Sequence, residues 1–268
     1  MVGQSKLKAQ IGRLLQDDNF PRFSIFIGEQ GSGRKTIIRS MLKGLGTCQE
    51  CAIDVDTVRE VIDEAYRQVS PVVYVFADAD NMSVAAKNAL LKVTEEPPNN
   101  AYFVMTLIMG DNTLPTIKSR ASLFYMDTYT TKEILEYYHN KTLDSDDEII
   151  EKCCNVPGDV DLLCGYDVNK FYEFIQTVVD NVAVVSGANS FKIGSRLCLS
   201  GDDKDKYDLV LFFKSFRAEC LDRLSSDPLK YIAGIGTTSD YLRESMIAGI
   251  NKQMIFDAWL LDIRKAWL

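Results

Sequence analysis

The sequence predicts an α/β domain built on a parallel β-sheet, followed by a region that is entirely helical. Two observations lead to this prediction. In the first half of the chain, short apolar runs alternate with amphipathic segments, which is typical of a parallel sheet covered by helices on both faces. Beyond about residue 128 the short apolar runs stop, and the periodic segments have apolar residues at helical spacing.

Four short apolar runs in the first half are expected to form buried strands. They are residues 23–28, 71–76, 101–109 and 122–126. The segments between and before them have helical periodicity or helix caps. These expected helices are residues 6–15, 34–46, 54–68, 83–96 and 114–120. The second half is expected to contain helices at residues 131–140, 145–154, 158–166, 169–185, 208–226 and 239–268.

Composition and charge exclude several classes of protein. The chain has 268 residues, of which 46% are hydrophobic and 25% charged, as in ordinary soluble globular proteins. It lacks the roughly 18 uninterrupted apolar residues of a membrane span and the apolar core of a signal peptide, so a cytoplasmic protein is expected. The net charge of −8 argues against a stand-alone nucleic-acid binder, because backbone phosphates repel an acidic protein.

Seven cysteines are present, and Cys48 and Cys51 form a Cys-x-x-Cys pair that raises the question of zinc. A structural zinc site needs four ligands, usually two such pairs. The next cysteines lie about a hundred residues further on, and His139 is the only histidine. Reduced thiols without metal are therefore expected, and the pair stays the one candidate for a metal site.

Residues 28–36, GEQGSGRKT, follow an apolar run and open an expected helix, as a phosphate-binding loop does. The usual pattern is G-x-x-x-x-G-K-[ST], and the spacer from Gly28 to Gly33 is intact. These two glycines and Gly31 preserve a backbone that can present N–H groups to a phosphate. Arg34, however, stands at the lysine position and Lys35 at the hydroxyl position.

The altered side chains predict that the loop has lost magnesium-dependent hydrolysis. The hydroxyl of the motif holds magnesium, whereas Lys35 has no acceptor atom. After the second run, Ala77 stands at the magnesium-binding position and Asp78 at the position of the water-activating Glu. No cofactor is required by this interpretation, and residual binding of ATP or phosphate is left open. The alternative is an active ATPase that uses Lys35 and Thr36 in a register shifted by one residue.

Two further segments carry a resemblance to a known family. They are DADNMSVAAKNALLKVTEEPPNNAYFVM at residues 78–105 and LPTIKSRAS at residues 114–122. They resemble the Asp-Glu-Ala-Asp box, the NALLKxLEEPP helix and the LPTIxSRC segment of bacterial clamp-loader subunits of the AAA+ family. The resemblance covers residues 2–128. It implies an AAA+ P-loop domain over residues 1–128, a small helical lid domain over 129–167 and a C-terminal helical collar domain over 168–268.

Within that family, the altered loop and box resemble the non-hydrolysing delta-prime subunits of DNA polymerase III. The resemblance implies that Arg120, with Ser119 before it, acts as an arginine finger on the γ-phosphate bound by a neighbouring subunit. The other interpretation of Arg120 is a surface salt bridge. The implied partners are the gamma/tau ATPase and delta subunits in a hetero-oligomeric ring, with DNA reached only through the complex and no membrane partner.

The sequence departs from the family pattern in several places. The family's four-cysteine zinc module is missing, and Cys48 and Cys51 resemble its remnant. Asp161 stands where the family's ATPases have the arginine of a Gly-x-x-Arg helix start. Of the properties that the resemblance implies, ring assembly through the third domain is the least supported. An unrelated P-loop kinase or GTPase and a specialised paralogue remain alternatives.

A basic face is conceivable in the helical half, although a solvated helix surface is favoured. Its residues would be Lys204, Lys206, Lys214 and Arg217.

Overall fold

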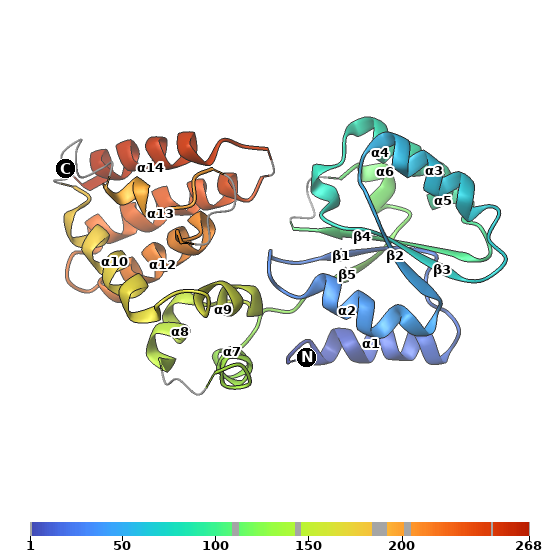
Figure 1. Ribbon diagram of the computed structural model, residues 1–268, viewed down its shortest axis with the longest axis horizontal. Helices are drawn as coiled ribbons and strands as arrows, with labels where there is room; N and C mark the ends of the chain where they lie inside the picture. The colour runs from blue at the N-terminus through green and yellow to red at the C-terminus, as the bar shows by residue number, and fades with distance from the viewer. Residues whose placement is uncertain are drawn as a thin grey trace. The chain divides into compact units, whose positions relative to one another are not determined.

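The computed structural model describes residues 2–108, 113–142, 146–183, 192–200, 205–247 and 249–267. The chain divides into two compact units, Gly3–Tyr129 and Thr130–Leu268, which Figure 1 shows. The boundary between the two units, after Tyr129, lies beside the one expected near residue 128. The finer division of the second half near residue 168 falls at the start of a helix inside the second unit and stays a prediction.

The first unit contains a five-stranded sheet with the strand order β2-β3-β4-β1-β5. Its strands are β1 (Phe23–Ile27), β2 (Thr47–Cys51), β3 (Val72–Phe76), β4 (Ala101–Leu107) and β5 (Ser122–Tyr125). Every neighbouring pair is parallel, so all five strands point the same way. The predicted α/β fold with a parallel sheet is confirmed.

Strand β2 was not expected, and the prediction of four strands was therefore wrong by one. Its sequence, TCQEC, is polar and lacks the apolar run by which buried strands are recognised. The reason is its position at the edge of the sheet, where it pairs only with β3 and its residues are exposed or half-buried. A strand that buries little surface carries little hydrophobic pattern.

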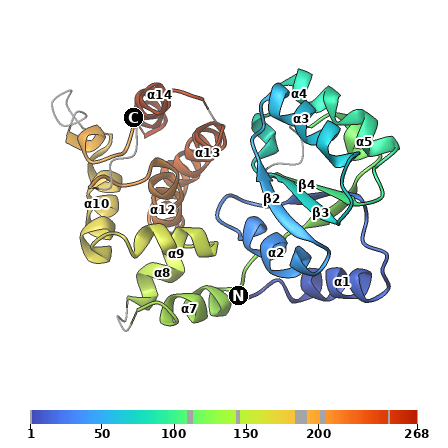
Figure 2. The same ribbon diagram turned by 45° about the vertical axis from the view of Figure 1, so that its right-hand side comes forward.

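Helices cover both faces of the sheet, as Figures 1 and 2 show. The helical elements of the unit are α1 (Ser5–Gln16), α2 (Arg34–Met41), η1 (Leu42–Gly44), α3 (Val55–Ala65), η2 (Ala79–Asn81), α4 (Val84–Ala89), α5 (Leu91–Glu95) and α6 (Pro115–Lys118). Residues of α1 and α2 pack with Phe26 on one face. Residues of α3, α4, α5 and α6 pack with Ile25 and Ile27 on the other. This alternation along β1 follows from the two-residue period of a strand.

The second unit is helical. Its helices are α7 (Thr131–His139), α8 (Asp147–Cys153), α9 (Pro157–Leu163), α10 (Val168–Asn181), α12 (Leu209–Asp222), α13 (Pro228–Ser245) and α14 (Lys252–Trp267). The fully buried Trp259 of α14 centres the core, with the rings of Phe212 and Phe216 of α12 at 5.4 and 5.1 Å. Its indole N–H donates to the hydroxyl of Thr238 on α13 at 3.1 Å, so three helices meet at one side chain.

A buried ion pair joins α9 to α12. The ammonium of Lys214 lies 2.9 and 3.0 Å from the two carboxylate oxygens of Asp159, and both side chains are almost fully buried. Lys214 therefore cannot belong to a solvated basic face, and that part of the sequence interpretation was wrong. The reason is that its position faces the partner carboxylate on α9, which local sequence does not reveal. Lys204, named for the same face, lies outside the described residues.

In the part of the chain that the structure describes, no helix is both long and apolar enough to span a membrane.

Candidate functional site

The loop between β1 and α2 has the backbone that a phosphate-binding loop requires. Gly31 and Gly33 adopt φ angles of 81° and 85°, a left-handed region that favours glycine. Gly28 is required for a different reason. A Cβ placed there would lie 2.5 Å from Cγ of Met126, which follows β5. The sequence-predicted glycines are thus each explained by the geometry of the loop.

Residues beyond the motif fix this loop in place. The hydroxyl of Tyr129 donates to the carbonyl of Ser32 at 2.7 Å. The side-chain amide of Gln4 both donates to and accepts from the backbone of Asp127, at 2.6 and 2.8 Å, and so ties the start of the chain to the end of β5. Sequence reasoning did not single out Tyr129 or Asp127, because their partners are distant in the chain.

Arg34 and Lys35, which stand at the lysine and hydroxyl positions of the motif, both pair with Asp78. One guanidinium nitrogen of Arg34 lies 3.2 Å from Oδ1 of Asp78, and the ammonium of Lys35 lies 3.0 Å from Oδ2. Each carboxylate oxygen is therefore engaged by a different cation. The structure brings together the three residues that the sequence placed in a degenerate nucleotide site, and it joins them to one another.

Asp78 is held where it can meet both cations. Strand β4 lies between β1 and β3, and Thr106 near its end is fully buried. The Thr106 hydroxyl accepts the backbone N–H of Asp78 at 2.8 Å. Asp78 itself has φ 51° and ψ 46°, a left-handed conformation that Asp tolerates better than most residues. Thr106 lies within an apolar run, so the sequence offered no sign of this role.

Arg34 is a buried charge with incomplete pairing. Its side chain is 6% exposed, and burial lowers the pKa of its guanidinium, while Asp78 and Asp80 act in the opposite direction. A guanidinium stays protonated in proteins, so the site keeps this positive charge. Its Nη1 and the Oγ of the neighbouring Ser32 are both buried, and neither has a hydrogen-bond partner among the described residues.

These residues do not fit a magnesium–nucleotide complex. A magnesium ion needs oxygen ligands, and the side chain at the hydroxyl position is the ammonium of Lys35. Ala77 contributes no side-chain oxygen, and the oxygens of Asp78 already face two cations. Thr36, the hydroxyl of the shifted register, is exposed on α2. The unpaired donors of Ser32 and Arg34, by contrast, are suited to an anion without metal.

Arg120 lies just beyond α6, where it forms a surface cluster. Its guanidinium is 2.8 Å from a carboxylate oxygen of Glu95 and donates to the carbonyl of Thr116 at 3.1 Å. The hydroxyl of Ser119 lies 3.5 Å from the same guanidinium. The Arg120 side chain is 39% exposed, so one side of the charged group remains open to solvent.

Arg120 and the loop lie at opposite edges of the sheet. The loop follows β1 and Asp78 follows β3, so both lie at the carboxyl edge of the parallel strands. Arg120 precedes β5, whose four residues pair with Ser24–Ile27 of β1, and it therefore lies at the amino edge. The separation along the strand direction is about 13 Å for four residues. Arg120 and the loop of the same chain therefore do not form one site.

Comparison with known proteins identifies the family. Residues 46–130 match the family model described as DNA polymerase III, delta subunit. The chain is 34% identical over 89 residues to the DNA polymerase III delta′ subunit of Yersinia pestis and 28% identical over 156 residues to the gamma/tau subunit of Mycobacterium tuberculosis. These matches support a clamp-loader AAA+ family member. The match covers 32% of the chain and 26% of the Yersinia protein, and 45% and 27% for the Mycobacterium protein.

Solved structures agree with this family at the level of the fold. A DNA polymerase III gamma subunit-related protein of Thermotoga maritima superposes with a TM-score of 0.54 at 16% identity, covering 97% of this chain and all of that one. Thermotoga maritima RuvB superposes with a TM-score of 0.52 at 14% identity, covering 97% of this chain and 87% of that one. The chain spans between a quarter and a third of the length of the curated clamp-loader proteins first named above.

Two features set this family member apart from the expected pattern. Cys48 and Cys51 lie three residues apart on β2, and therefore on opposite faces of the sheet, where they pack against different cores. They cannot act as a pair of ligands for one ion, and burial raises the pKa of the Cys51 thiol to about 11. Asp161 of α9 accepts hydrogen bonds from Tyr137 of α7 and from Lys141, which lies just beyond that helix. The expected arginine position therefore holds an acid paired within the second unit.

Proposed function

We propose that this clamp-loader family member does not hydrolyse ATP and acts on the nucleotide of a neighbouring subunit through Arg120. The observation that carries the proposal is the placement of Arg120 at the amino edge of the sheet, partly exposed and remote from its own loop. A supplied arginine stabilises the charge that develops on a transferred phosphoryl group. An arginine so placed is suited to a phosphate bound by another chain.

The chain's own loop supports the first half of this proposal. Arg34, Lys35 and Asp78 form a closed set of ion pairs at the point where a magnesium ion and an attacking water would have to be held. Opening that set would leave the buried Arg34 without its carboxylate, which is costly for a buried charge. We infer that the loop serves as a fixed structural element of the subunit.

The relatives support a proposal for the partners. Proteins similar to this chain are named as gamma/tau and delta′ subunits of DNA polymerase III. We therefore propose a hetero-oligomeric clamp loader in which a gamma/tau-type ATPase and a delta subunit flank this chain, with DNA reached through the complex. Four large apolar side chains on α13 and α14 are 58–85% exposed, which suits burial between subunits. They are Leu229, Ile232, Met254 and Leu261.

The test is ATP turnover by a complex reconstituted with the clamp-loading ATPase from the same cell. Replacing Arg120 by Ala is expected to leave complex formation intact and to lower turnover by about 10³-fold or more, the range seen for supplied arginines in GTPases. The matched control is Lys118→Ala, which removes a neighbouring half-buried cation at the end of α6. If Arg120→Ala turns over ATP as fast as the wild type, the proposed role is wrong.

The active-ATPase alternative has its own test. The isolated chain is expected to show no magnesium-dependent ATP hydrolysis, and Lys35→Ala would then change nothing. Hydrolysis that disappears in Lys35→Ala would establish the alternative in place of the main proposal. The buried donors of Ser32 and Arg34 favour a weaker activity, anion binding without metal. Calorimetry with ATP in the presence of a chelator measures it directly, and retention of heat without magnesium is the expected result.

A further inference from the structure

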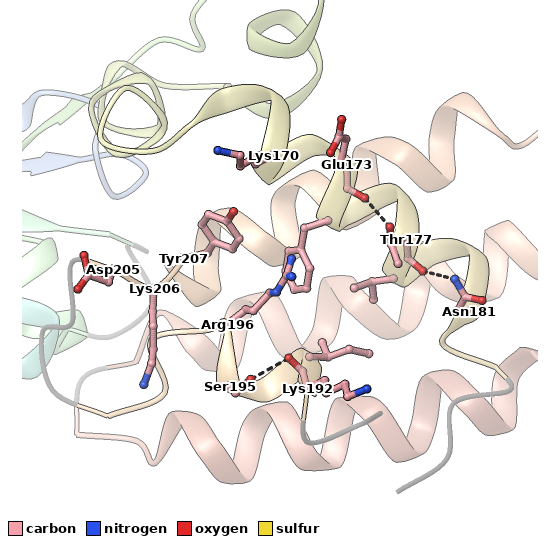
Figure 3. A pocket seen from close by; sticks show the side chains of 13 residues that line it. Lys170, Glu173, Thr177, Asn181, Lys192, Ser195, Arg196, Asp205, Lys206 and Tyr207 are labelled. Carbon is pink, nitrogen blue, oxygen red and sulfur yellow. Dashed lines mark hydrogen bonds between the residues drawn. The ribbon is translucent and has the colours of Figure 1, made fainter. Parts of the chain in front are cut away.

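The second unit contains a groove that is remote in sequence from both the loop and Arg120. Figure 3 shows its lining, which consists of one side of α10, the largely helical segment 192–196 and the segment 205–207. Its volume is about 980 Å³, at the upper end of the range for ligand-binding sites. Nothing in the proposed role of Arg120 uses this groove.

The groove collects positive charge in an acidic protein. Four of its lining residues are cationic, namely Lys170, Lys192, Arg196 and Lys206, and they come from three separate segments. The acidic lining residues are Glu173 and Asp205, and the carboxylate of Asp167, at the start of α10, pairs with Lys170 at 2.8 Å. The chain as a whole has a formal net charge of −8, so a local excess of cations runs against its composition. Such an excess favours an anionic ligand.

The floor of the groove is apolar and aromatic. Phe174 and Val178 of α10 line it together with Ile193 and Tyr207. The guanidinium carbon of Arg196 lies 5.5 Å from the centre of the Phe174 ring, so this cation lies over an aromatic ring. Cations above an apolar floor are complementary to a ligand that carries both acidic and bulky apolar groups.

The framework of the groove is fixed by contacts within the unit. The N–H of Tyr207 donates to the carbonyl of Arg196 at 2.9 Å, and the N–H of Cys198 donates to the carbonyl of Tyr207 at 2.8 Å. The Tyr207 ring packs edge-on against Phe171, with 4.9 Å between ring centres. Gly194 lets the segment 192–196 approach α14, because a Cβ there would lie 3.2 Å from Phe256. A framework ordered in advance lowers the entropy that a ligand must lose on binding.

The shape of the groove distinguishes a peptide from a compact ligand. Its lining on α10 runs from Lys170 to Asn181, with members three or four residues apart on one helix face. The eleven residue steps from Lys170 to Asn181 extend about 16 Å along the helix, which matches about five residues of extended chain. We propose that this groove binds a short acidic segment of a partner protein, with one bulky apolar side chain seated against Phe174.

The experiment selects short random peptides displayed on mRNA against the full-length chain, with the Lys192→Glu/Arg196→Glu variant used for counter-selection. Both replaced side chains are exposed, and retention of the wild-type melting temperature verifies that the variant folds. Recovered peptides are expected to be rich in Asp and Glu and to contain Phe, Leu, Ile or Trp. Their affinity should fall about tenfold or more in the variant, and it should weaken as salt is added.

The matched control is Lys132→Glu/Lys265→Glu, which makes the same charge change at exposed positions outside the groove. It should bind the recovered peptides within about twofold of wild type, because such distant surface charges are largely screened. Single-stranded DNA of equal charge is measured beside the peptides. The proposal is overturned if no peptide depends on the groove, if the dependent peptides are not acidic, if the control weakens binding equally, or if only the DNA binds.

Discussion

Replacing Lys214 by Met tests whether the buried ion pair between α9 and α12 behaves as its geometry requires. Asp159 would lose the ammonium that lies 2.9 and 3.0 Å from its oxygens, and would keep only the N–H donors of Asn155 and Val156, at 3.0 and 3.3 Å. Removing one partner of a buried pair costs about 3–5 kcal/mol of unfolding free energy. At about 2–4 °C per kcal/mol, the melting temperature of the variant should fall by roughly 6–20 °C.

The pH dependence of the unfolding free energy lost in Lys214→Met gives a second measurement. Burial raises the pKa of the Asp159 carboxyl, while Lys214 and the two N–H groups oppose the shift. An acid whose pKa is raised by folding loses stability as pH increases above its unfolded value, since the folded state then binds more protons. Loss of Lys214 should raise that pKa further, so the deficit of Lys214→Met should be larger near neutral pH than in mild acid.

The double variant Lys214→Met/Asp159→Asn supplies the control. It removes both charges, keeps a side chain that can accept the N–H of Asn155, and is expected to recover most of the lost stability with little pH dependence. Urea unfolding followed by circular dichroism measures all three proteins across pH. A single variant that loses less than about 1 kcal/mol, or a deficit that is constant with pH, would refute this account of the pair.

Three further outcomes are expected from the first unit. Glu95→Gln should lower ATP turnover of the reconstituted complex by less than Arg120→Ala does, because it loosens the guanidinium without removing it; an equal loss would contradict this. Gly28→Ala should cost about 1–3 kcal/mol in thermal unfolding, since its Cβ would meet Met126, and an unchanged melting temperature would argue against so tight a contact. Cys51, with its thiol pKa raised to about 11, should resist iodoacetamide at pH 8 in the folded protein, and mass spectrometry of the labelled peptides would reveal any rapid modification.

Much of the first unit could be predicted because its strands are buried. A strand such as β1, covered on both faces, must be apolar throughout, and the sequence displays that directly. The glycines of the loop were equally visible, because positive φ angles and close approaches leave few alternatives. Strand β2 was missed for the converse reason, since an exposed edge strand has no need of an apolar pattern.

The pairing of the candidate site could not be read from the sequence. Arg34, Lys35 and Asp78 were each singled out as departures from a catalytic pattern, yet nothing in their spacing showed that they meet. That contact depends on β4 lying between β1 and β3 and on Thr106 fixing Asp78. Lys214 is a similar case, since its burial is decided by Asp159, 55 positions earlier. Side chains paired across distant elements leave no local pattern.

The ion-pair set at the loop would make the proposed loss of hydrolysis depend on several residues at once. In a hydrolysing site the carboxylate after the second strand must remain available to a metal or a water. Here Asp78 balances a buried guanidinium and a lysine, so restoring a lysine at Arg34 alone would leave Lys35 on the carboxylate and no oxygen for magnesium. Restoring a hydroxyl at Lys35 alone would leave the bulkier Arg34 inside the loop. Each reversal is therefore ineffective without the other, and Ala77 would still contribute no metal ligand. Under the proposed function, such a chain would keep its loop for the stability of the fold, and selection on its surface, including Arg120, could continue independently of its own nucleotide chemistry.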